Sequence, residues 1–367
     1  MTADQPAPLP ARRNLAEDMV DWDLAVSTAR RLMKPGPAVT PAEAAEVVGA
    51  LRRFAAESVG HVRAYTQLAA PSGTAPAVVV DRAGWVQANA DGMRTVLRPL
   101  VQKLRGHRGA PGPATAAVGS RLTGLEAGGL FAFLSNKVLG QFDPFFEGVS
   151  EPSGGRMLLV APNIVHVERE LGVVPAHFRL WVCLHEETHR TQFTAVPWLR
   201  RYLLDELAGL VGGTEVDPAR LASMAKEAVG TLGRMLRGGA EVSLLDLVQT
   251  PEQRERLERL TAVMSLLEGH ADVVMDGVGP AVVPSVDVIR ERFDVRRGTA
   301  GTFDQLLRRL LGFDAKLRQY RDGAAFVRGA LAEVGVAGFN AVWEGPDRLP
   351  TPAEIADPAA WVRRVHG

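Results

Sequence analysis

Apolar residues recur every three to four positions along most of the chain, which is the spacing of an amphipathic helix. The segment that starts at Thr40-Pro41-Ala42-Glu43 shows this clearly, because threonine caps a helix, proline suits the first helical position and glutamate follows three residues after the cap. Proline and glycine pairs end the runs. Helices are therefore predicted over residues 15–32, 41–68, 85–104 and 122–139 and, with glycine-rich breaks, from 175 almost to the end.

Two short runs follow a different pattern. Val78–Val80 and Arg156–Pro162 are short and mostly apolar, and residues that favour turns stand beside each of them. We predict a strand at each run, whereas the proline-rich stretch 347–358 is expected to be extended. The sequence therefore predicts an α+β fold that is predominantly helical and contains a few short strands.

The length of 367 residues allows more than one domain. We expect a loose tail at residues 1–13, a helical region with a short strand at 14–150, and a second region at 151–367. The last two regions can form one continuous domain.

The charge balance narrows the range of partners. The chain has 42 basic and 42 acidic residues, whereas a dedicated nucleic-acid-binding protein carries a basic surface. No run approaches the roughly 18 apolar residues of a membrane span, and the first residues lack the pattern of a signal peptide. The single cysteine, Cys183, fits a reducing compartment. We therefore expect a cytoplasmic protein with neither nucleic acid nor membrane as a partner.

One motif carries chemistry, the sequence His185-Glu186-Glu187-Thr188-His189. It lies in a predicted helix between Pro175 and Pro197, where two histidines four residues apart project in the same direction. Such a pair supplies two nitrogen ligands to zinc, and the glutamate after the first histidine can reach a metal-bound water as a general base. The motif therefore predicts a zinc site with His185 and His189 as ligands and Glu186 as the catalytic base.

A catalytic zinc site needs a third protein ligand. The candidates lie in a second predicted helix, in the sequence Glu268-Gly269-His270-Ala271-Asp272. We favour Glu268 over His270, because Asp272 shares the face of Glu268 and could accept a hydrogen bond from the free ring nitrogen of a ligand histidine. The alternative without a metal is a buried helix with hydrogen-bonded histidines, in which Glu268 and Asp272 pair with some of the many arginines.

These motifs resemble two groups of known proteins. The HExxH motif followed by Glu-x-x-x-Asp resembles the glutamate-zincin site of thermolysin-like metallopeptidases. The segments Trp181–Phe193 and Glu268–Ala271 are more similar to a bacterial family of zincin-like metallohydrolases that is common in actinobacteria. The similarity extends from about Asp81 to Trp361 and includes Gly140–Phe145. It implies a zincin-like helical core with a zinc site, and some family members are associated with the biosynthesis of a deazaflavin cofactor.

The sequence differs from thermolysin-like enzymes in the long separation of His189 from Glu268 and in the lack of an evident tyrosine–histidine pair for the transition state. Tyr320 is the candidate for stabilising an oxyanion, and the alternative is a packing or surface tyrosine. By analogy with zincins, the strand Met157–Val160 is expected at the rim of the cleft, where an extended peptide could pair with it.

The sequence thus predicts a zinc-dependent hydrolase, with a peptidase as the first hypothesis. The substrate is then a peptide or a small amide. The alternatives are a hydrolase that acts on a small amide in cofactor metabolism, and a zincin-shaped binding or scaffold protein without activity.

Overall fold

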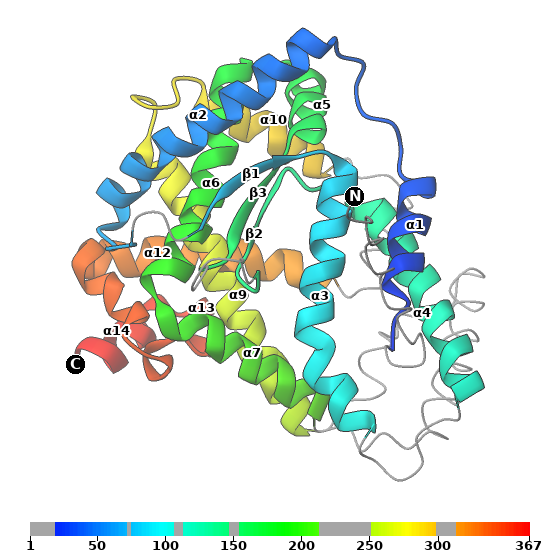
Figure 1. Ribbon diagram of the computed structural model, residues 1–367. Helices are drawn as coiled ribbons and strands as arrows, with labels where there is room; N and C mark the ends of the chain where they lie inside the picture. Colours follow the sequence, from blue (N-terminus) through cyan, green and yellow to red (C-terminus); the bar gives the residue numbers. More distant parts are fainter. Residues whose placement is uncertain (1–18, 72–74, 106–112, 147–153, 213–250, 299–312) are drawn as a thin grey trace, which may run out of the picture.

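The computed structural model in Figure 1 describes residues 19–71, 75–105, 113–146, 154–212, 251–298 and 313–367. Helices dominate it, as the sequence predicts, and a three-stranded sheet lies among them. The expected tail at residues 1–13 lies outside the described residues. The helices of the first half are α1 (Trp22–Leu32), α2 (Pro41–Thr66), α3 (Arg82–Arg105), α4 (Pro113–Leu134) and α5 (Ala161–Leu171). Those of the second half are α6 (Pro175–Ala195), α7 (Pro197–Gly212), α9 (Pro251–Val278), α10 (Val286–Gly298), α12 (Phe313–Phe339), α13 (Pro352–Ala356) and α14 (Pro358–His366).

The sheet joins distant parts of the chain. Strand β3 (Arg156–Val160) lies in the centre, parallel to β1 (Ala77–Val80) and antiparallel to β2 (Gly140–Asp143). The two predicted strands are therefore neighbours, but β3 is paired on both sides. The expectation that this strand forms the rim of the cleft is wrong, because the edge strand on the side of α6 is β2.

An ion pair joins the last residue of β2 to the first residue of β3. Asp143 stands opposite Arg156 in the register, and the Arg156 Nε donates to Asp143 Oδ2 at 3.2 Å. The guanidinium of Arg156 also lies 4.0 Å from the ring centre of Phe146. Both residues of the pair are largely buried, so the pair fixes how β2 lies against β3.

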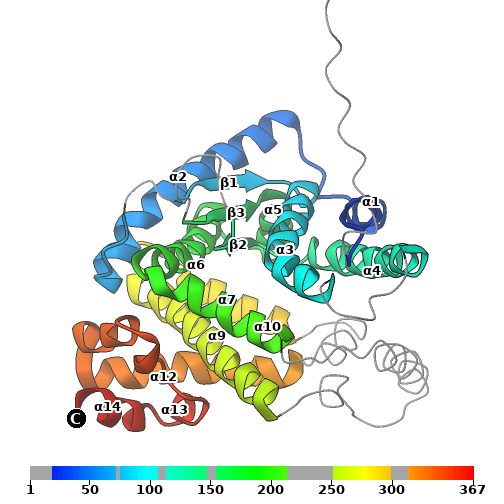
Figure 2. The ribbon, with the colours of Figure 1, turned by 60° about the horizontal axis from the view of Figure 1, so that its bottom comes forward.

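The elements form layers that are seen from the side in Figure 2. Helix α2 covers one side of the sheet and packs along α6, which in turn crosses α9. A first core of buried side chains joins these elements and includes Leu51, Met157 and Phe178. On the far side of α9, α12 and α14 enclose a second core around Phe326 and Trp361. Helix α6 therefore runs between the sheet and α9, which places its side chains in a cleft between two layers.

The stretch Asp322–Trp343, which by length and composition could cross a membrane, covers the C-terminal part of α12 and the 3-10 turn Asn340–Trp343 that follows it. In the structure this stretch packs along α9, and Phe326, Val327 and Ala330 are buried in the second core. Gly335 also interrupts it with a φ of 67°, a conformation that glycine adopts without strain. One face of this stretch is therefore packed against the rest of the protein.

Local signals explain where the elements differ from the prediction. The stretch 347–358 is not simply extended, because Thr351 and Glu354 form a capping box that starts α13. Helix α5 was not expected, since Pro162 in the sequence suggests a stop; here the proline occupies the first turn, where it needs no hydrogen-bond partner. Helix α4 ends at Leu134, which leaves the following residues free to form β2.

Candidate metal centre

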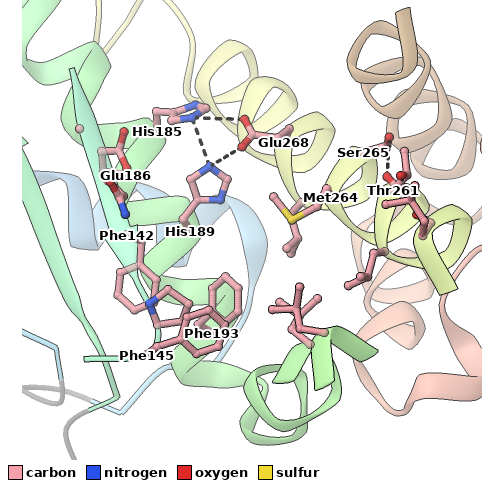
Figure 3. Close-up of a pocket in the computed structure, with 18 of the residues that line it drawn as sticks. Phe142, Phe145, His185, Glu186, His189, Phe193, Thr261, Met264, Ser265 and Glu268 are labelled. Carbon is pink, nitrogen blue, oxygen red and sulfur yellow. Dashed lines mark hydrogen bonds and ion pairs between the residues drawn. The ribbon is translucent and has the colours of Figure 1, made fainter. Parts of the chain in front are cut away.

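The two histidines of the motif lie on the side of α6 that faces α9. Figure 3 shows both imidazoles pointing toward the carboxylate of Glu268, which extends from α9. The His185 Nε2 is 3.7 Å from Glu268 Oε2, and the His189 Nε2 is 3.7 Å from Glu268 Oε1. The two Nε2 atoms are 3.2 Å apart. The structure therefore brings the two histidines of one helix together with a carboxylate that is more than 70 residues away along the chain.

These distances fit a small metal ion. A tetrahedral zinc ion with bonds of about 2.0–2.1 Å holds its ligand atoms about 3.3–3.4 Å from one another. The observed distances of 3.2, 3.7 and 3.7 Å lie around this value. His185, His189 and Glu268 can thus hold one ion without a large movement of the two helices.

The charges around the cleft also favour a cation. Glu186 and Glu268 both line it, and among the described residues that line it there is no lysine or arginine. Burial and the nearby carboxylate of Glu268 raise the pKa of Glu186 well above 4.5. A divalent cation between these groups would offset the part of this rise that comes from Glu268.

Hydrogen bonds fix the ring of His189. The Gln192 Nε2 donates to the backbone carbonyl of Leu267 at 3.0 Å, which identifies the opposite amide atom as the oxygen. That oxygen, Oε1, lies 2.9 Å from His189 Nδ1. Since a carbonyl oxygen can only accept, the Nδ1 of His189 carries the proton. Its Nε2 is then left with a lone pair that points at the cluster.

His270 belongs to the same network but not to the ligand cluster. Its Nδ1 lies 3.0 Å from Gln192 Nε2, and its ring packs against Phe339 and Trp343. Burial, followed by the nearby His189, lowers the pKa of His270 to about 3, so the ring is neutral and its Nδ1 accepts the bond from Gln192. Between the two candidates for the third ligand, the structure therefore places Glu268 at the cluster and turns His270 toward the second core.

The expected contact of Asp272 with a ligand histidine is wrong. The Arg290 Nη1 donates to Asp272 Oδ1 at 3.2 Å, so this carboxylate is engaged by α10. The group beside His185 Nδ1 is instead the sulfur of Met275, at 3.1 Å. Residue 275 follows Glu268 by seven positions and is turned from it by only about 20°, whereas residue 272 is turned by about 40°.

Glu186 lies between α6 and the edge strand. Only 5% of its surface is exposed, and its carboxylate accepts a hydrogen bond from the backbone N–H of Phe142 in β2. Gly140 packs directly on this side chain: a Cβ atom at residue 140 would stand 2.5 Å from Glu186 Cγ. A glycine is thus required at this position of β2 for the carboxylate to keep its place.

A cavity of about 510 Å³ opens beside the cluster. The stacked rings of Phe142 and Phe193 lie near its β2 side, and leucines of α7 and α9 line the side away from β2. Tyr320, the candidate for stabilising an oxyanion, falls within α12, but its side chain lies outside the described residues.

Four further residues belong to the site and were not among the predicted ones: Gly140, Phe142, Gln192 and Met275. Gln192 stands three residues after His189 and Met275 seven after Glu268, which places each on the face of its neighbour. Helical spacing therefore contains a signal for these two. The contacts of Phe142 and Gly140 depend on the sheet, and no local pattern reveals them.

Comparisons with known proteins agree with this geometry. Residues 20–362 match the family of zincin-like metallopeptidases. The chain belongs to this family. A crystal structure of a protein from Chloroflexus aurantiacus, described as a candidate hydrolase with a novel fold, is similar with a TM-score of 0.69 and 30% identity, over 95% of this chain and 99% of that one. No functionally curated protein is significantly similar. Family and neighbour together support a metallohydrolase.

Proposed function

We propose that the protein is a zinc-dependent hydrolase of amide bonds that acts as a peptidase. His185, His189 and Glu268 would hold the zinc, and Glu186 would be the general base. The observation that carries the proposal is the convergence of two Nε2 atoms and one carboxylate within ligand distance, beside a buried carboxylate that is not part of the ligand set.

Bound zinc supplies a Lewis acid that polarises the substrate carbonyl and lowers the pKa of a water molecule. Glu186 takes a proton from the attacking water and later gives it to the leaving amine. The carbon–nitrogen bond of the amide breaks, a carbon–oxygen bond to the water oxygen forms, and the products are a carboxylic acid and an amine. A carboxyl group whose pKa is raised by burial is suited to both proton transfers.

The protein itself orients the reacting groups. Gln192 holds the ring of His189, and the N–H of Phe142 holds the carboxylate of Glu186. An extended peptide would lie along the outer edge of β2, which takes the place that the sequence analysis gave to β3. The association with deazaflavin-cofactor biosynthesis, a cytoplasmic location and the absence of nucleic-acid and membrane partners stay predictions.

The test combines metal analysis with an activity screen. The wild-type protein is loaded with zinc, analysed for metal content and incubated with a peptide mixture whose products are read by mass spectrometry. We expect one zinc per chain, loss of zinc in His189→Ala, and a loss of turnover of about 10²–10⁴-fold in Glu186→Gln with its zinc retained.

Glu187→Gln is the matched control. This carboxylate lies on the opposite side of α6 and pairs with Arg190, so its variant should keep both zinc and turnover. A wild-type protein that takes up no stoichiometric zinc would contradict the proposal.

A further inference from the structure

The part of the cavity that leads away from the candidate metal centre is lined by apolar side chains of two facing helices. Helix α7 contributes Leu203, Leu207 and Leu210, and α9 contributes Leu257, Leu260 and Met264. Within each helix these residues follow one another at intervals of three or four positions, so each set forms a stripe along one face. Met264, next to Glu268 on this face, leaves 38% of its surface exposed.

The stripe on α9 begins at the metal cluster and runs away from it. Leu257 and Glu268 are eleven positions apart, which is about 16.5 Å along a helix at 1.5 Å per residue. This path is longer than the side chain of any amino acid. A single leucine or phenylalanine of a peptide would therefore fill only the turn nearest to Glu268.

The walls of this path offer nothing to a peptide backbone. Thr261 and Ser265 are the polar residues between Leu257 and Glu268 that line the cavity, and both hydroxyls donate to carbonyls of their own helix, at 2.7 and 2.9 Å. No other side-chain donor lies among the described residues that line this part of the cavity. The carbonyl groups of a peptide placed here would lose their hydrogen bonds to water without replacement, which is costly.

We propose that the cavity between α7 and α9 binds a long aliphatic chain attached to the scissile amide, so that the substrate is an N-acylated peptide or amine. The proposal rests on the proposed hydrolase activity and names its substrate class. A chain of this length without polar atoms, attached to an amide carbonyl, is an aliphatic acyl group. Hydrolysis consumes one water and releases the fatty acid and the free amine, which leaves along β2.

Binding of alkyl hydroxamates tests the cavity separately from catalysis. The hydroxamate group chelates zinc, and the alkyl tail reports on the path behind it. Acetohydroxamate, hexanohydroxamate and decanohydroxamate are titrated into the zinc-loaded protein by calorimetry. Each buried methylene contributes up to about fourfold in affinity, so we expect decanohydroxamate to bind at least about tenfold more tightly than hexanohydroxamate.

A substitution at the far end of the path locates the tail. Leu257→Trp should reduce the affinity for decanohydroxamate by about tenfold or more and leave the affinity for acetohydroxamate unchanged. Glu258→Trp places the same side chain on the exposed face of α9 and is the matched control. Leu207→Trp, from the facing helix, is a second variant that should give the same pattern. Circular dichroism verifies that each variant is folded.

The outcomes separate the two proposals. Failure of every hydroxamate to bind would overturn the metal site and the proposed function with it. Equal affinity for the three hydroxamates, or tail preference that Leu257→Trp and Leu207→Trp leave unchanged, would overturn the acyl site alone. In a parallel activity assay, N-decanoyl-diglycine should be hydrolysed at the acyl amide faster than N-acetyl peptides with leucine or phenylalanine. The reverse preference would show that a peptide side chain enters the cavity instead.

Discussion

The cleft and the C-terminal segment each hold a cluster of ionisable side chains, but the carboxylate in the C-terminal segment is paired with an arginine and those in the cleft are not. In the cleft, Glu186 and Glu268 face two imidazoles, and no lysine or arginine is among the described lining residues. In the C-terminal segment, Glu354 accepts from Arg364 Nε at 2.7 Å, from Arg364 Nη2 at 2.9 Å and from the Thr351 N–H at 2.9 Å.

The pKa values follow this difference. Burial and Glu268 raise the pKa of Glu186 well above 4.5, whereas the pKa of Glu354 is lowered because its bonds to Arg364 and Thr351 outweigh the effect of burial. The C-terminal pair thus stabilises the fold by itself. Among the described residues, the carboxylates that line the cleft have no lysine or arginine beside them, and such an excess of acidic groups is typical of a binding site.

The largest expected effect comes from filling the space above Glu186. In Gly140→Ala the new Cβ would overlap Glu186 Cγ, so the carboxylate must move. Displacement of a catalytic group by about 1 Å can cost roughly 10²-fold in rate, and we expect a loss of this order in kcat with the zinc content unchanged. Gly60→Ala, on an exposed face of α2 with nothing within 4 Å, is the control and should have wild-type activity. Full activity of Gly140→Ala would show that the position of Glu186 is not critical.

A smaller effect, on the affinity for zinc, is expected when the hydrogen bond between Gln192 and His189 is removed. Gln192→Leu removes the acceptor of its Nδ1–H, and loss of such a group typically costs about 10–100-fold in metal affinity. Competition with a zinc-sensitive dye measures this affinity. Thr194→Ala, which removes a hydroxyl bonded to the carbonyl of Arg190 on the same helix, should bind zinc as the wild type does. An unchanged affinity in Gln192→Leu would mean that packing alone orients His189.

For the C-terminal cluster we expect a loss of stability of about 1 kcal/mol in Glu354→Gln at neutral pH, because Arg364 is partly solvated and its pairing is weakened by water. The folded-state pKa of Glu354 lies below its ordinary value of 4.5, so its contribution is complete above that pH. It is lost as the pH falls through the folded-state pKa. Urea unfolding of both proteins at several pH values should show the curves converging in acid. Glu333→Gln, at an exposed position of α12, should change little at any pH.

The smallest change, with the opposite sign, is expected in the cleft. In metal-free protein at neutral pH, Glu186→Gln removes a carboxyl group whose ionisation is opposed by burial and by Glu268. We expect the free energy of unfolding to stay equal or to rise by up to about 1 kcal/mol. Urea unfolding in the presence of a chelator measures it. A loss as large as that in Glu354→Gln would contradict the contrast between the two clusters.

The parts of the site that the sequence predicts are those that helical spacing determines. His185 and His189 project together because they are four residues apart on one helix, and Glu268 lies on a helix whose acidic residue would be costly to bury alone. The helical character of the fold and the strands at β1 and β3 followed from the same kind of local pattern. Strand order did not, because pairing joins residues about 80 positions apart.

The errors also have physical causes. Asp272 shares a face with Glu268, but the shared face does not show that the carboxylate of Asp272 accepts a hydrogen bond from Arg290 of α10. Similarly, the prolines of the stretch 347–358 suggested an extended segment. The capping box of Thr351 and Glu354 starts a short helix there instead. Sequence patterns therefore predict three candidate ligands that the structure brings together, but they do not predict the hydrogen-bond partners of the site, which come from other elements.

The ion pair between Asp143 and Arg156 has a consequence for the chemistry some distance away. A shift of β2 by one residue against β3 would turn every side chain of β2 to the other face. Gln141 would then stand where Gly140 leaves room for Glu186, and the N–H that holds the carboxylate would point elsewhere. Because glycine has no side chain to resist such a shift, the ion pair at the opposite end of this four-residue strand helps to keep the proposed base aligned.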